Sequence, residues 1–372
     1  MKSTEGSVLF LVNKLKRGGA EKVFMNQASY LAGRHAIYLA AALPSSSADN
    51  YLIDYGMNRE DVFFCDFKNF FDLGAFWRLR RFVRKRDIRV VYSTLEFSNV
   101  ISRLLKIFSP SIRVIIRESG MAFRKPPMVK LLDIILNFLA FRIVAVSAAV
   151  RDSLADYQHL HAHKFVIIEN GVPVLPYEVV AGLRADVFRK GLQILHVGSM
   201  NNDNKGHAEL IDVFNSLSDE LLANVSLTFA GDGNLRSSLE AKARKTKKPD
   251  KIIFVGNLTG GQMKAQYLSA DIYILNSKNE GCPNTVLEAM SYGLPVLSTR
   301  VGGATEIIED GKSGILVPVG DKEAMRDAIR NLLTDESLRH EMGKAAVLRI
   351  RDKYTLEGQI SKLAPLLGVR MK

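Results

Sequence analysis

Residues 270–303 read ADIYILNSKNEGCPNTVLEAMSYGLPVLSTRVGG, and this stretch decides the fold class. Its two apolar runs, 270–277 and 295–303, enclose a segment long enough for a loop followed by a helix. Runs that are nearly continuous in Val, Ile and Leu are typical of strands buried on both faces of a parallel sheet, and the intervening helix supplies the crossover. The stretch therefore predicts one unit of a doubly wound α/β domain.

The same alternation of apolar runs and helical stretches extends over the whole chain. Ligands of such sheets bind outside the carboxyl ends of the strands, and two facing domains place a site between them. We therefore expect an α/β fold of two facing Rossmann-like doubly wound domains, with the active site in the interdomain cleft. The apolar runs cover residues 8–13, 37–43, 62–67, 89–94, 113–118, 142–147 and 164–172 in the first half, and 192–199, 225–233, 251–258, 270–277, 295–303 and 314–321 in the second.

The length of the chain also favours two domains, because 372 residues correspond to two domains of ordinary size. Residues 172–191 contain two prolines and interrupt the alternation. We predict a first domain over 1–177, a linker over 178–190 and a second domain over 191–353. A last helical segment within 354–372 is expected to pack back on the first domain.

The composition is that of an ordinary globular protein, with 47% apolar and 24% charged residues. The only two cysteines, Cys65 and Cys282, give neither a disulfide framework nor a zinc cluster, which favours a reducing compartment. The apolar run 8–12 is too short for a signal peptide, and the run 131–141 is too short and too polar to span a bilayer. We expect a cytoplasmic protein, with peripheral attachment to the cytoplasmic face of the membrane as a further candidate.

The net charge of +12 falls mostly in the first half of the chain. Residues 70–86 mix phenylalanines and a tryptophan with many arginines, and residues 121–132 repeat this mixture of apolar and basic types. Such a surface suits an anionic membrane, a phosphorylated substrate or a nucleic acid, whereas the simplest alternative is a helix with its apolar face in the core and its arginines in water. No recognisable nucleic-acid module is present, so we expect no nucleic-acid partner. The basic cluster consists of Arg78, Arg80, Arg81, Arg84, Lys85, Arg86 and Arg89.

Glu280 and Glu288 stand eight residues apart around a predicted helix start. If the helix begins near Pro283 or Asn284, Glu280 lies in the loop before it and Glu288 lies one turn inside it. The N–H groups and the dipole at a helix N-terminus suit phosphate or sugar oxygens. Two glutamates at this spacing are more often surface residues, and only their place in a strand–loop–helix unit favours a binding site.

The segment NSKNEGCPNTVLEAMSYG, residues 276–293, closely resembles the donor-binding signature of glycosyltransferase family 4, retaining enzymes of the GT-B fold, of the kind found in bacterial surface-polysaccharide synthesis. Further segments resemble that family in the expected order, so the resemblance covers nearly the whole chain. These segments are RGGAEK (17–22), FVIIENGV (165–172), HVGSMNNDNKGHAELIDVF (196–214), FAGDGNLRSSLE (229–240), FVGNLTG (254–260) and STRVGGATEIIEDGKSGILV (298–317).

This resemblance implies roles for individual residues. Glu280 is expected to bind hydroxyls of the transferred sugar, Lys205 the pyrophosphate and Glu288 the ribose hydroxyls, and Glu280 and Lys205 are the predicted catalytic residues. The glycine loop at Gly18 and Gly19 is expected to approach the pyrophosphate. The full predicted donor set is Gly18, Gly19, Gly198, Ser199, Lys205, Asn257, Leu258, Gly281, Cys282, Pro283, Asn284, Thr285 and Glu288, with Asn257 and Leu258 near the base.

The chemistry of the reaction fits these residue types. Breaking a glycosidic phosphate bond develops negative charge on the leaving diphosphate, and fixed cations and N–H donors stabilise it. No Asp-x-Asp metal signature occurs in a suitable place, so we expect neither a metal nor a cofactor, the nucleotide sugar being a co-substrate. The resemblance implies reaction on one face of the sugar, with the acceptor hydroxyl guided by the leaving phosphate, so Glu280 is not expected to be a nucleophile. UDP-sugar is the expected donor, because it is frequent in the family.

One position departs from the family pattern. Family members commonly place an arginine after the glycine at the end of the first strand of the second domain, whereas this chain has Ser199. Serine donates one hydrogen bond but brings no charge. On the acceptor side, the candidates follow strands of the first domain, and a salt bridge is as well supported as acceptor binding for the last two of them. They are Glu96, Asn99, Arg117 and Glu118.

The sequence therefore predicts a retaining glycosyltransferase of the hexosyl- or N-acetylhexosaminyltransferase type. It would move a sugar from a nucleotide diphosphate sugar to a glycan or lipid-linked acceptor in cell-surface polysaccharide synthesis. Two alternatives stay open: a non-catalytic sugar-nucleotide-binding partner of another transferase, which the serine at position 199 allows, and a sugar-nucleotide epimerase, against which the spacing of the two glutamates argues.

Overall fold

The computed structural model of the chain describes residues 7–16, 18–45, 52, 55–185 and 191–371. Within it the chain divides into two compact units. The first unit comprises Met1–Gly171 together with Leu356–Lys372, and the second comprises Val172–Thr355. Each unit is described by itself.

The first unit is built on a seven-stranded sheet in which all neighbouring strands run parallel. The strand order is β3-β2-β1-β4-β5-β6-β7. Because all pairs are parallel, each connection crosses over the sheet, and helices fill most of these crossovers. The strands are β1 (Ser7–Val12), β2 (Ile37–Ala41), β3 (Val62–Phe64), β4 (Ile88–Thr94), β5 (Arg113–Glu118), β6 (Arg142–Ala145) and β7 (Phe165–Ile167).

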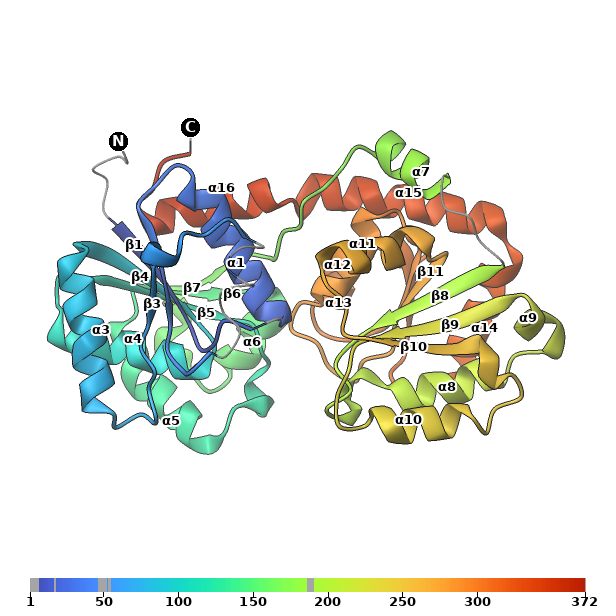
Figure 1. Cartoon of the computed structure of the whole chain (residues 1–372), viewed down its shortest axis with the longest axis horizontal. Coiled ribbons are helices and arrows are strands. Elements are labelled where there is room, and N and C mark those ends of the chain that lie inside the picture. Colours follow the sequence, from blue (N-terminus) through green and yellow to red (C-terminus); the bar gives the residue numbers. More distant parts are fainter. Residues whose placement is uncertain (1–6, 17, 46–51, 53–54, 186–190, 372) are drawn as a thin grey trace. The chain divides into compact units, whose positions relative to one another are not determined.

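Helices cover both faces of this sheet (Figure 1). Alternate residues of β1 divide between the two faces. Val8 and Phe10 pack under α1 (Gly19–Ala32) and α16 (Leu356–Leu367). Leu9 and Leu11 pack in a separate core under α3 (Leu73–Lys85) and α4 (Glu96–Phe108). This alternation explains why the strand reads as an uninterrupted apolar run. The helices on the second face and beyond are α3 (Leu73–Lys85), α4 (Glu96–Phe108), α5 (Pro127–Leu136) and α6 (Ala148–Ala155).

The second unit repeats the design with a six-stranded parallel sheet, ordered β10-β9-β8-β11-β12-β13. One core lies under α8 (His207–Asn215) and α14 (Lys322–Thr334), and the other lies under α12 (Asn284–Ser291) and α15 (Glu336–Lys353). The strands are β8 (Leu192–Val197), β9 (Val225–Ala230), β10 (Ile252–Gly256), β11 (Ile272–Leu275), β12 (Val296–Thr299) and β13 (Gly314–Val317). The helices are α7 (Tyr177–Ala185), α8 (His207–Asn215), α9 (Asp219–Ala223), α10 (Arg236–Ala243), α11 (Gly260–Ser269), α12 (Asn284–Ser291), α13 (Ala304–Ile307), α14 (Lys322–Thr334) and α15 (Glu336–Lys353).

The strand order reverses direction at one point in each sheet, between β1 and β4 in the first unit and between β8 and β11 in the second. Connections leave such a switch point toward opposite faces, so the loops at the carboxyl ends of the two strands diverge and leave room for a ligand. Every apolar run predicted as a strand contains a strand of the structure, and the predicted fold class of two doubly wound α/β sheets is confirmed.

The boundaries between the units differ from those predicted. The second unit begins at Val172 because its N–H group donates to the Tyr354 carbonyl oxygen, at 2.9 Å, and its side chain is buried in the core of that unit. Residues expected in the linker form α7, which Arg184 fixes by donating to the carbonyl oxygens of Tyr267 and Ala270. Residues 186–190 of the predicted linker lie outside the described part of the chain.

The C-terminal segment joins the first unit from Leu356 onward, and not from residue 354. Tyr354 stays with the second unit, because its hydroxyl donates to the Glu306 carbonyl oxygen at 2.9 Å. Ile360 and Leu363 of α16 are fully buried in the same core as α1. Among the helices of the described residues, none has the length and apolar character needed to cross a bilayer.

Candidate active site

Two loops meet at the switch point of the second unit, one after β8 and one after β11. Gly206 ends the first loop in the left-handed region, with φ +64°, and a Cβ there would overlap the carbonyl oxygen of Asn276. Glycine adopts this conformation at little steric cost. The Asn276 side chain donates from Nδ2 to the Gly206 carbonyl oxygen at 3.0 Å. The start of α8 is thereby fixed against the end of β11.

Lys205 and Glu280 join these two loops through their side chains. Lys205 Nζ lies 2.6 Å from Glu280 Oε1, and the Ser277 hydroxyl donates to the same oxygen at 2.6 Å. The pair is partly buried, with 22% of the Lys205 side chain and 12% of the Glu280 side chain exposed. A Cβ on Gly198 would come within 3.0 Å of Lys205 Cγ, so the glycine leaves room for the lysine stem. The fold therefore brings together the cation predicted for the diphosphate and the carboxylate predicted for the sugar.

A second ion pair crosses between the same loops at the protein surface. Lys278 Nζ pairs with the Asp203 carboxylate, and about half or more of each side chain is exposed. The backbone reinforces this contact, because the Lys278 N–H group donates to the Asn204 carbonyl oxygen at 2.7 Å. The Asn204 side chain donates to the Asn279 carbonyl oxygen at 3.0 Å. These contacts hold the loops together at a point where water screens the charges.

Helix α12 begins at Asn284, as predicted, so Glu280 lies in the loop before the helix and Glu288 in its second turn. The Tyr267 hydroxyl donates to Glu288 Oε2 at 3.1 Å, and the Tyr267 ring stacks on Tyr292 with a centroid distance of 5.4 Å. Burial, followed by the nearby Glu288 carboxylate, raises the pKa of Tyr267 well above 10. The phenol therefore stays protonated and remains a donor that orients Glu288.

Two glycines after β12 support the loop that carries Glu280. Gly302 has φ +34°, and a Cβ on it would overlap the Glu280 carbonyl oxygen. Gly303 donates from its N–H group to the Gly281 carbonyl oxygen at 3.1 Å, and a Cβ there would overlap that oxygen. Cys282 is partly buried in this loop and forms no disulfide with Cys65. The loop 280–282 thus rests directly on glycine backbone.

Ser199 and the loop after β9 border the same edge of the sheet. Ser199 is exposed, and its hydroxyl accepts a hydrogen bond from Asn201 Nδ2 at 2.9 Å. Gly231, with φ +136°, packs so closely on Gly198 that a Cβ would overlap the Gly198 carbonyl oxygen. After β10, Asn257 is exposed, whereas Leu258 is partly buried against a core of the second unit.

Two histidines pack beneath the loop that carries Lys205. The rings of His196 and His207 lie edge to face at 4.7 Å, and both side chains are buried. His196 Nδ1 lies 2.9 Å from the Ile274 carbonyl oxygen, and a backbone hydrogen bond links His207 to Gly198. Burial lowers the pKa of His196 well below 6.5 and that of His207 to about 4. Both rings are therefore neutral near pH 7, and they act as core side chains.

In the first unit, Gly18 and Gly19 stand at the start of α1, where the resemblance places the pyrophosphate. The Glu21 side chain turns back toward this helix end, since a Cβ on Gly18 would overlap Glu21 Oε2. Glu21 is 5% exposed, and burial raises its pKa. A carboxyl group therefore lies beside the glycine loop, which the sequence did not predict. Arg17, at the start of this motif, lies outside the described residues.

The four acceptor-side candidates lie at the carboxyl ends of β4 and β5. Asn99 and Arg117 are each 1% exposed. Asn99 Nδ2 donates to the Arg117 carbonyl oxygen at 3.1 Å, and the Arg117 guanidinium donates to Thr94 Oγ1 at 3.2 Å and to Asn170 Oδ1 at 2.7 Å. These buried contacts tie the strand ends to α4 and indicate a supporting role for both side chains.

Glu118 belongs to a buried cluster of charges. Its carboxylate lies 2.9 Å from Lys125 Nζ, which also lies 2.6 Å from Asp133, and Asp133 lies 2.9 Å from Arg103. Glu96 lies beside this cluster, is only partly buried, and has its pKa raised by burial. Among the four candidates, Glu96 is therefore the one whose carboxyl group is best placed to meet a ligand.

Two family profiles match the chain one after the other. The profile described as Glycosyltransferase Family 4 matches residues 17–174, and the profile described as Glycosyl transferases group 1 matches residues 185–349. The chain belongs to glycosyltransferase family 4. The predicted donor loops between residues 198 and 288 fall within the second of these matches, and the glycine loop at Gly18 and Gly19 falls within the first.

Relatives of this glycosyltransferase differ in how much of their length the chain matches. It is 24% identical over 356 residues to GalNAc-alpha-(1->4)-GalNAc-alpha-(1->3)-diNAcBac-PP-undecaprenol alpha-1,4-N-acetyl-D-galactosaminyltransferase of Campylobacter jejuni, covering 93% of this chain and 94% of the relative. It is 35% identical to sulfoquinovosyl transferase SQD2 of Arabidopsis thaliana over 41% of this chain, which is 29% of that protein. The match to glycosyltransferase MJ1607 of Methanocaldococcus jannaschii covers 63% of that protein. The chain thus spans less than two thirds of two of these three relatives.

Solved structures of similar fold match the whole chain. HepE of Anabaena in complex with UDP-glucose superposes with a TM-score of 0.84 at 17% identity, covering 97% of this chain and 99% of that one. Sucrose-phosphate synthase of Thermosynechococcus elongatus superposes with a TM-score of 0.78 at 15% identity, covering 97% and 98%. At these identities the likeness establishes the fold, and the glycosyltransferase has the GT-B fold that the resemblance implied.

Sequence reasoning missed several residues of this glycosyltransferase that hold its site together. Ser277 lies two residues after the end of β11, and a polar residue there, three positions before Glu280, was a usable signal. Tyr267 gave no signal, because nothing in the sequence connects it with Glu288. Arg103 and Asp133 read as ordinary helix residues, although they form the buried ion pair beside Glu118. Across the described ranges, no three His, Cys, Asp or Glu side chains are grouped closely enough to hold a metal ion.

Proposed function

We propose that this glycosyltransferase moves a sugar from a nucleotide diphosphate sugar to a glycan or lipid-linked acceptor, with retention of configuration. The observation that carries the proposal is the contact between Lys205 and Glu280 at the switch point of the second unit. One residue is a cation suited to a diphosphate, and the other is a carboxylate suited to sugar hydroxyls.

The leaving diphosphate would be stabilised by fixed positive charge. Lys205 supplies an ammonium group, and the N-terminal ends of α8 and α12 follow the two loops that the lysine joins. A helix N-terminus favours a nearby anion through its N–H groups and its dipole. Such preorganised groups stabilise the charge that develops as the glycosidic bond breaks. We therefore propose a reaction that needs neither a metal ion nor a cofactor.

Glu280 would orient the transferred sugar. Its side-chain contacts with Lys205 and Ser277 both fall on Oε1. Over the part of the chain that is described, no hydrogen bond is made to Oε2, so this oxygen can accept from a sugar hydroxyl. The remaining donor contacts would come from the backbone of Gly281, Cys282 and their neighbours through Thr285. Ser199 and Gly198 would lie at the diphosphate, as would Gly18 and Gly19 of the glycine loop.

Glu288 would hold the ribose hydroxyls of the nucleotide. Tyr267 orients the Glu288 carboxylate. Glu288 lies one turn into α12, whereas Glu280 lies in the loop before this helix. Asn257 and Leu258, after β10, would border the base. UDP-sugar is our proposed donor, because HepE was crystallised with UDP and with UDP-glucose. We propose a hexose or an N-acetylhexosamine as the transferred sugar, because the Campylobacter jejuni relative is named for transfer of N-acetylgalactosamine.

Retention follows if the acceptor hydroxyl attacks on the face from which the diphosphate departs. Glu280 is engaged by Lys205 and Ser277 through one oxygen, an arrangement suited to positioning and not to nucleophilic attack. The acceptor proton would then pass to the leaving phosphate oxygen, and positioning would supply much of the rate. On the acceptor side, we assign a contact to Glu96.

The acceptor class is proposed from the relatives. One is named for a substrate carried on undecaprenol, and another is a capsular polysaccharide biosynthesis glycosyltransferase, CapM, of Staphylococcus aureus. We therefore propose a role in cell-surface polysaccharide synthesis on the cytoplasmic side of the membrane.

The proposal is tested by donor binding and hydrolysis over a panel of UDP-, GDP- and ADP-sugars, with and without EDTA. We expect turnover of one donor that EDTA does not change and that Glu280→Ala abolishes. Binding with no turnover, even with lipid-linked acceptors, would favour the non-catalytic alternative, which the exposed serine at position 199 keeps open. If no nucleotide sugar bound, the assignment of the donor site would be wrong.

A further inference from the structure

Most of the large apolar side chains that are exposed in the described part of the chain lie on neighbouring helices of the first unit. They occur near the start of α3, at the end of α4 and along α5 and the short helical turns beside it. Helix α4 contacts both α3 and α5, so these helices form one continuous layer. We call their exposed side the α3–α5 surface. Its main apolar members are Trp77, Phe108, Met128, Leu131, Ile135 and Phe138.

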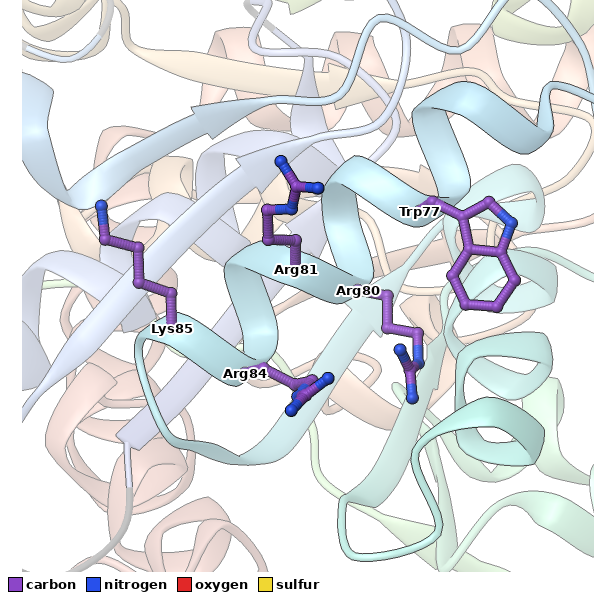
Figure 2. Close-up of a pocket in the computed structure, with 5 residues that line it drawn as sticks. All are labelled: Trp77, Arg80, Arg81, Arg84 and Lys85. Carbon is purple, nitrogen blue, oxygen red and sulfur yellow. The ribbon is translucent and has the colours of Figure 1, made fainter.

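A stripe of cations runs along α3. Arg80, Arg81, Arg84 and Lys85 follow Trp77 at spacings of three and four residues, which places all five on one side of the helix. Figure 2 shows their side chains on successive turns of α3, where they line an open pocket. Among the described residues, none forms an ion pair with Arg81, Arg84 or Lys85, so the described part of the chain does not neutralise this positive charge.

The aromatic end of this stripe is held in place. The Arg80 guanidinium lies over the Trp77 ring at 5.2 Å and donates to the Phe108 carbonyl oxygen at 2.9 Å. Trp77 packs edge to face on Phe108 at 5.5 Å, yet 46% of Trp77 stays exposed. Trp77 therefore joins the cations of α3 to the apolar end of α4.

The side of helix α5 that faces water is apolar, unlike that of an ordinary surface helix. Met128, Leu131 and Phe138 are 71%, 57% and 63% exposed. A surface helix normally turns polar residues outward. The only acidic residue of α5, Asp133, is instead buried against Arg103 and Lys125. The buried side of this helix, with Val129, Asp133 and Leu136, faces the protein, and its exposed side is apolar.

Acidic side chains are nearly absent from the three helices. Helix α3 has none, α4 has only Glu96, and α5 has only Asp133. The exposed side of the layer therefore combines uncompensated positive charge with apolar side chains.

We propose that the α3–α5 surface docks on an anionic lipid bilayer, with the stripe of α3 facing the phosphates and α5 entering the interface. Cations attract an anionic leaflet over a Debye length, and exposed apolar side chains gain by leaving water. Tryptophan suits the boundary between the two, because its ring is apolar and its N–H group is polar. This inference concerns attachment and does not depend on the proposed transfer reaction.

Other occupants fit the surface less well. A nucleic acid would complement the stripe on α3 but would leave in water Met128 of α5 and Phe138 of the short helical turn that follows it. A second copy of the chain would bring one stripe of α3 against another positive surface, which costs free energy. If anionic vesicles did not bind, an acidic protein would be the remaining occupant.

Trp77 provides the readout, because it is the only tryptophan in the chain. We expect its emission to shift to shorter wavelength with vesicles of phosphatidylglycerol and phosphatidylcholine, and to be quenched by brominated acyl chains. High salt should weaken this binding, and phosphatidylcholine vesicles alone should give little. An equal shift with neutral vesicles, or none with anionic ones, would overturn the proposal.

The cations are tested by combining Arg81→Gln, Arg84→Gln and Lys85→Gln, since glutamine is compatible with a helix. Each cation near an anionic surface contributes roughly a fivefold change in affinity, so about a hundredfold loss is expected for the three. The matched control removes the same charge from exposed positions of the second unit: Arg244→Gln, Lys245→Gln and Lys248→Gln. Equal losses in both variants would mean that overall charge alone decides binding, and the surface would be rejected.

The apolar half is tested by combining Leu131→Gln with Phe138→Gln. We expect at least about a tenfold loss of vesicle affinity, because both side chains leave water in the bound state. Leu348→Gln, which changes an exposed leucine of α15, serves as the control. Circular dichroism checks the fold of every variant. If light scattering showed that these variants dissociate an oligomer while vesicle binding is unchanged, the surface would be a protein interface and not a membrane one.

Discussion

Lys205 and Glu280 lie 75 positions apart in the sequence, yet Nζ of one lies 2.6 Å from Oε1 of the other. The same two loops are joined a second time by Lys278 and Asp203, which are largely exposed. In the first pair the lysine belongs to the loop after β8, and in the second pair it belongs to the loop after β11. The first pair lies in the predicted site and the second lies at the surface. A variant of Lys278 can therefore serve as a control for a variant of Lys205, because both lysines join the same two loops.

Replacing Lys205 by methionine should reduce transfer strongly while leaving the fold intact. The variant keeps most of the side-chain volume but removes the cation proposed to stabilise the leaving diphosphate. Loss of one such preorganised group costs roughly a hundredfold to a thousandfold in kcat. The measurement is the rate of sugar transfer, or of donor hydrolysis, at saturating donor.

Lys278→Met is the matched control for this variant. It breaks an exposed ion pair between the same two loops, and such pairs contribute about 0.2–1 kcal/mol. We expect transfer within a few-fold of the wild type. If both lysine variants lost activity equally, Lys205 would be acting only by holding the loops together.

Ser199→Arg should strengthen donor binding. The position lies at the end of the strand that precedes Lys205, is exposed, and carries an arginine in the family pattern. A charge-assisted hydrogen bond to the diphosphate is expected to lower the dissociation constant of the donor roughly tenfold. Ser199→Gln is the neutral comparison, and calorimetry with the donor measures both. An equal gain with glutamine would argue against a charge effect.

Gly302→Ala should damage the donor loop without touching a side chain of the site. The added Cβ would overlap the Glu280 carbonyl oxygen, and φ at this position is +34°. Accommodating it costs about 1–3 kcal/mol or shifts the loop. We expect a lower melting temperature together with weaker donor binding. Gly260→Ala, at the start of α11 where a Cβ meets nothing within 4 Å, should be close to neutral in both measurements.

The stability of the second unit should fall as the pH decreases from about 6.5 to about 4. Burial lowers the pKa of His207 to about 4 in the folded chain, so only the unfolded chain binds this proton in that range. The state that binds more protons gains as pH falls, and the free energy of unfolding decreases by about 3 kcal/mol over the window. Above pH 6.5 this contribution is constant. Urea unfolding at several pH values measures it.

His207→Asn should flatten this dependence, because asparagine does not titrate and can still donate a hydrogen bond toward Gly198. His196, whose pKa burial also lowers, should contribute a remaining slope of the same sign. An unchanged pH profile in the asparagine variant would show that other groups govern the acid sensitivity.

The fold was predictable because its signals are local. Every run from 8–13 to 314–321 contains a strand, since only a strand buried on both faces needs so many consecutive apolar residues. The start of α12 at Asn284 was predictable for the same reason, from Pro283 and Asn284 next to an apolar pattern. The unit boundary at Val172 was not predicted, because a hydrogen bond to distant Tyr354 decides it.

The candidate site was predictable only in part. Lys205, Glu280 and Glu288 came from the resemblance, and the structure adds the partners that orient them, Ser277 and Tyr267. On the acceptor side, the sequence treated four polar residues alike. Tertiary packing separates them, because Asn99 and Arg117 are buried in hydrogen bonds, whereas Glu96 is partly exposed.

The sequence by itself determined the two parallel sheets, their helices and the family of the chain, because periodicity and short motifs act between residues that are near in sequence. Only the tertiary structure decided which charges meet. The contact of Lys205 with Glu280, the burial of Asp133 and the uncovered apolar side of α5 all depend on segments that the fold brings together. Ion pairing and burial depend on distance in space, and distance in space is set by the packing of the whole unit.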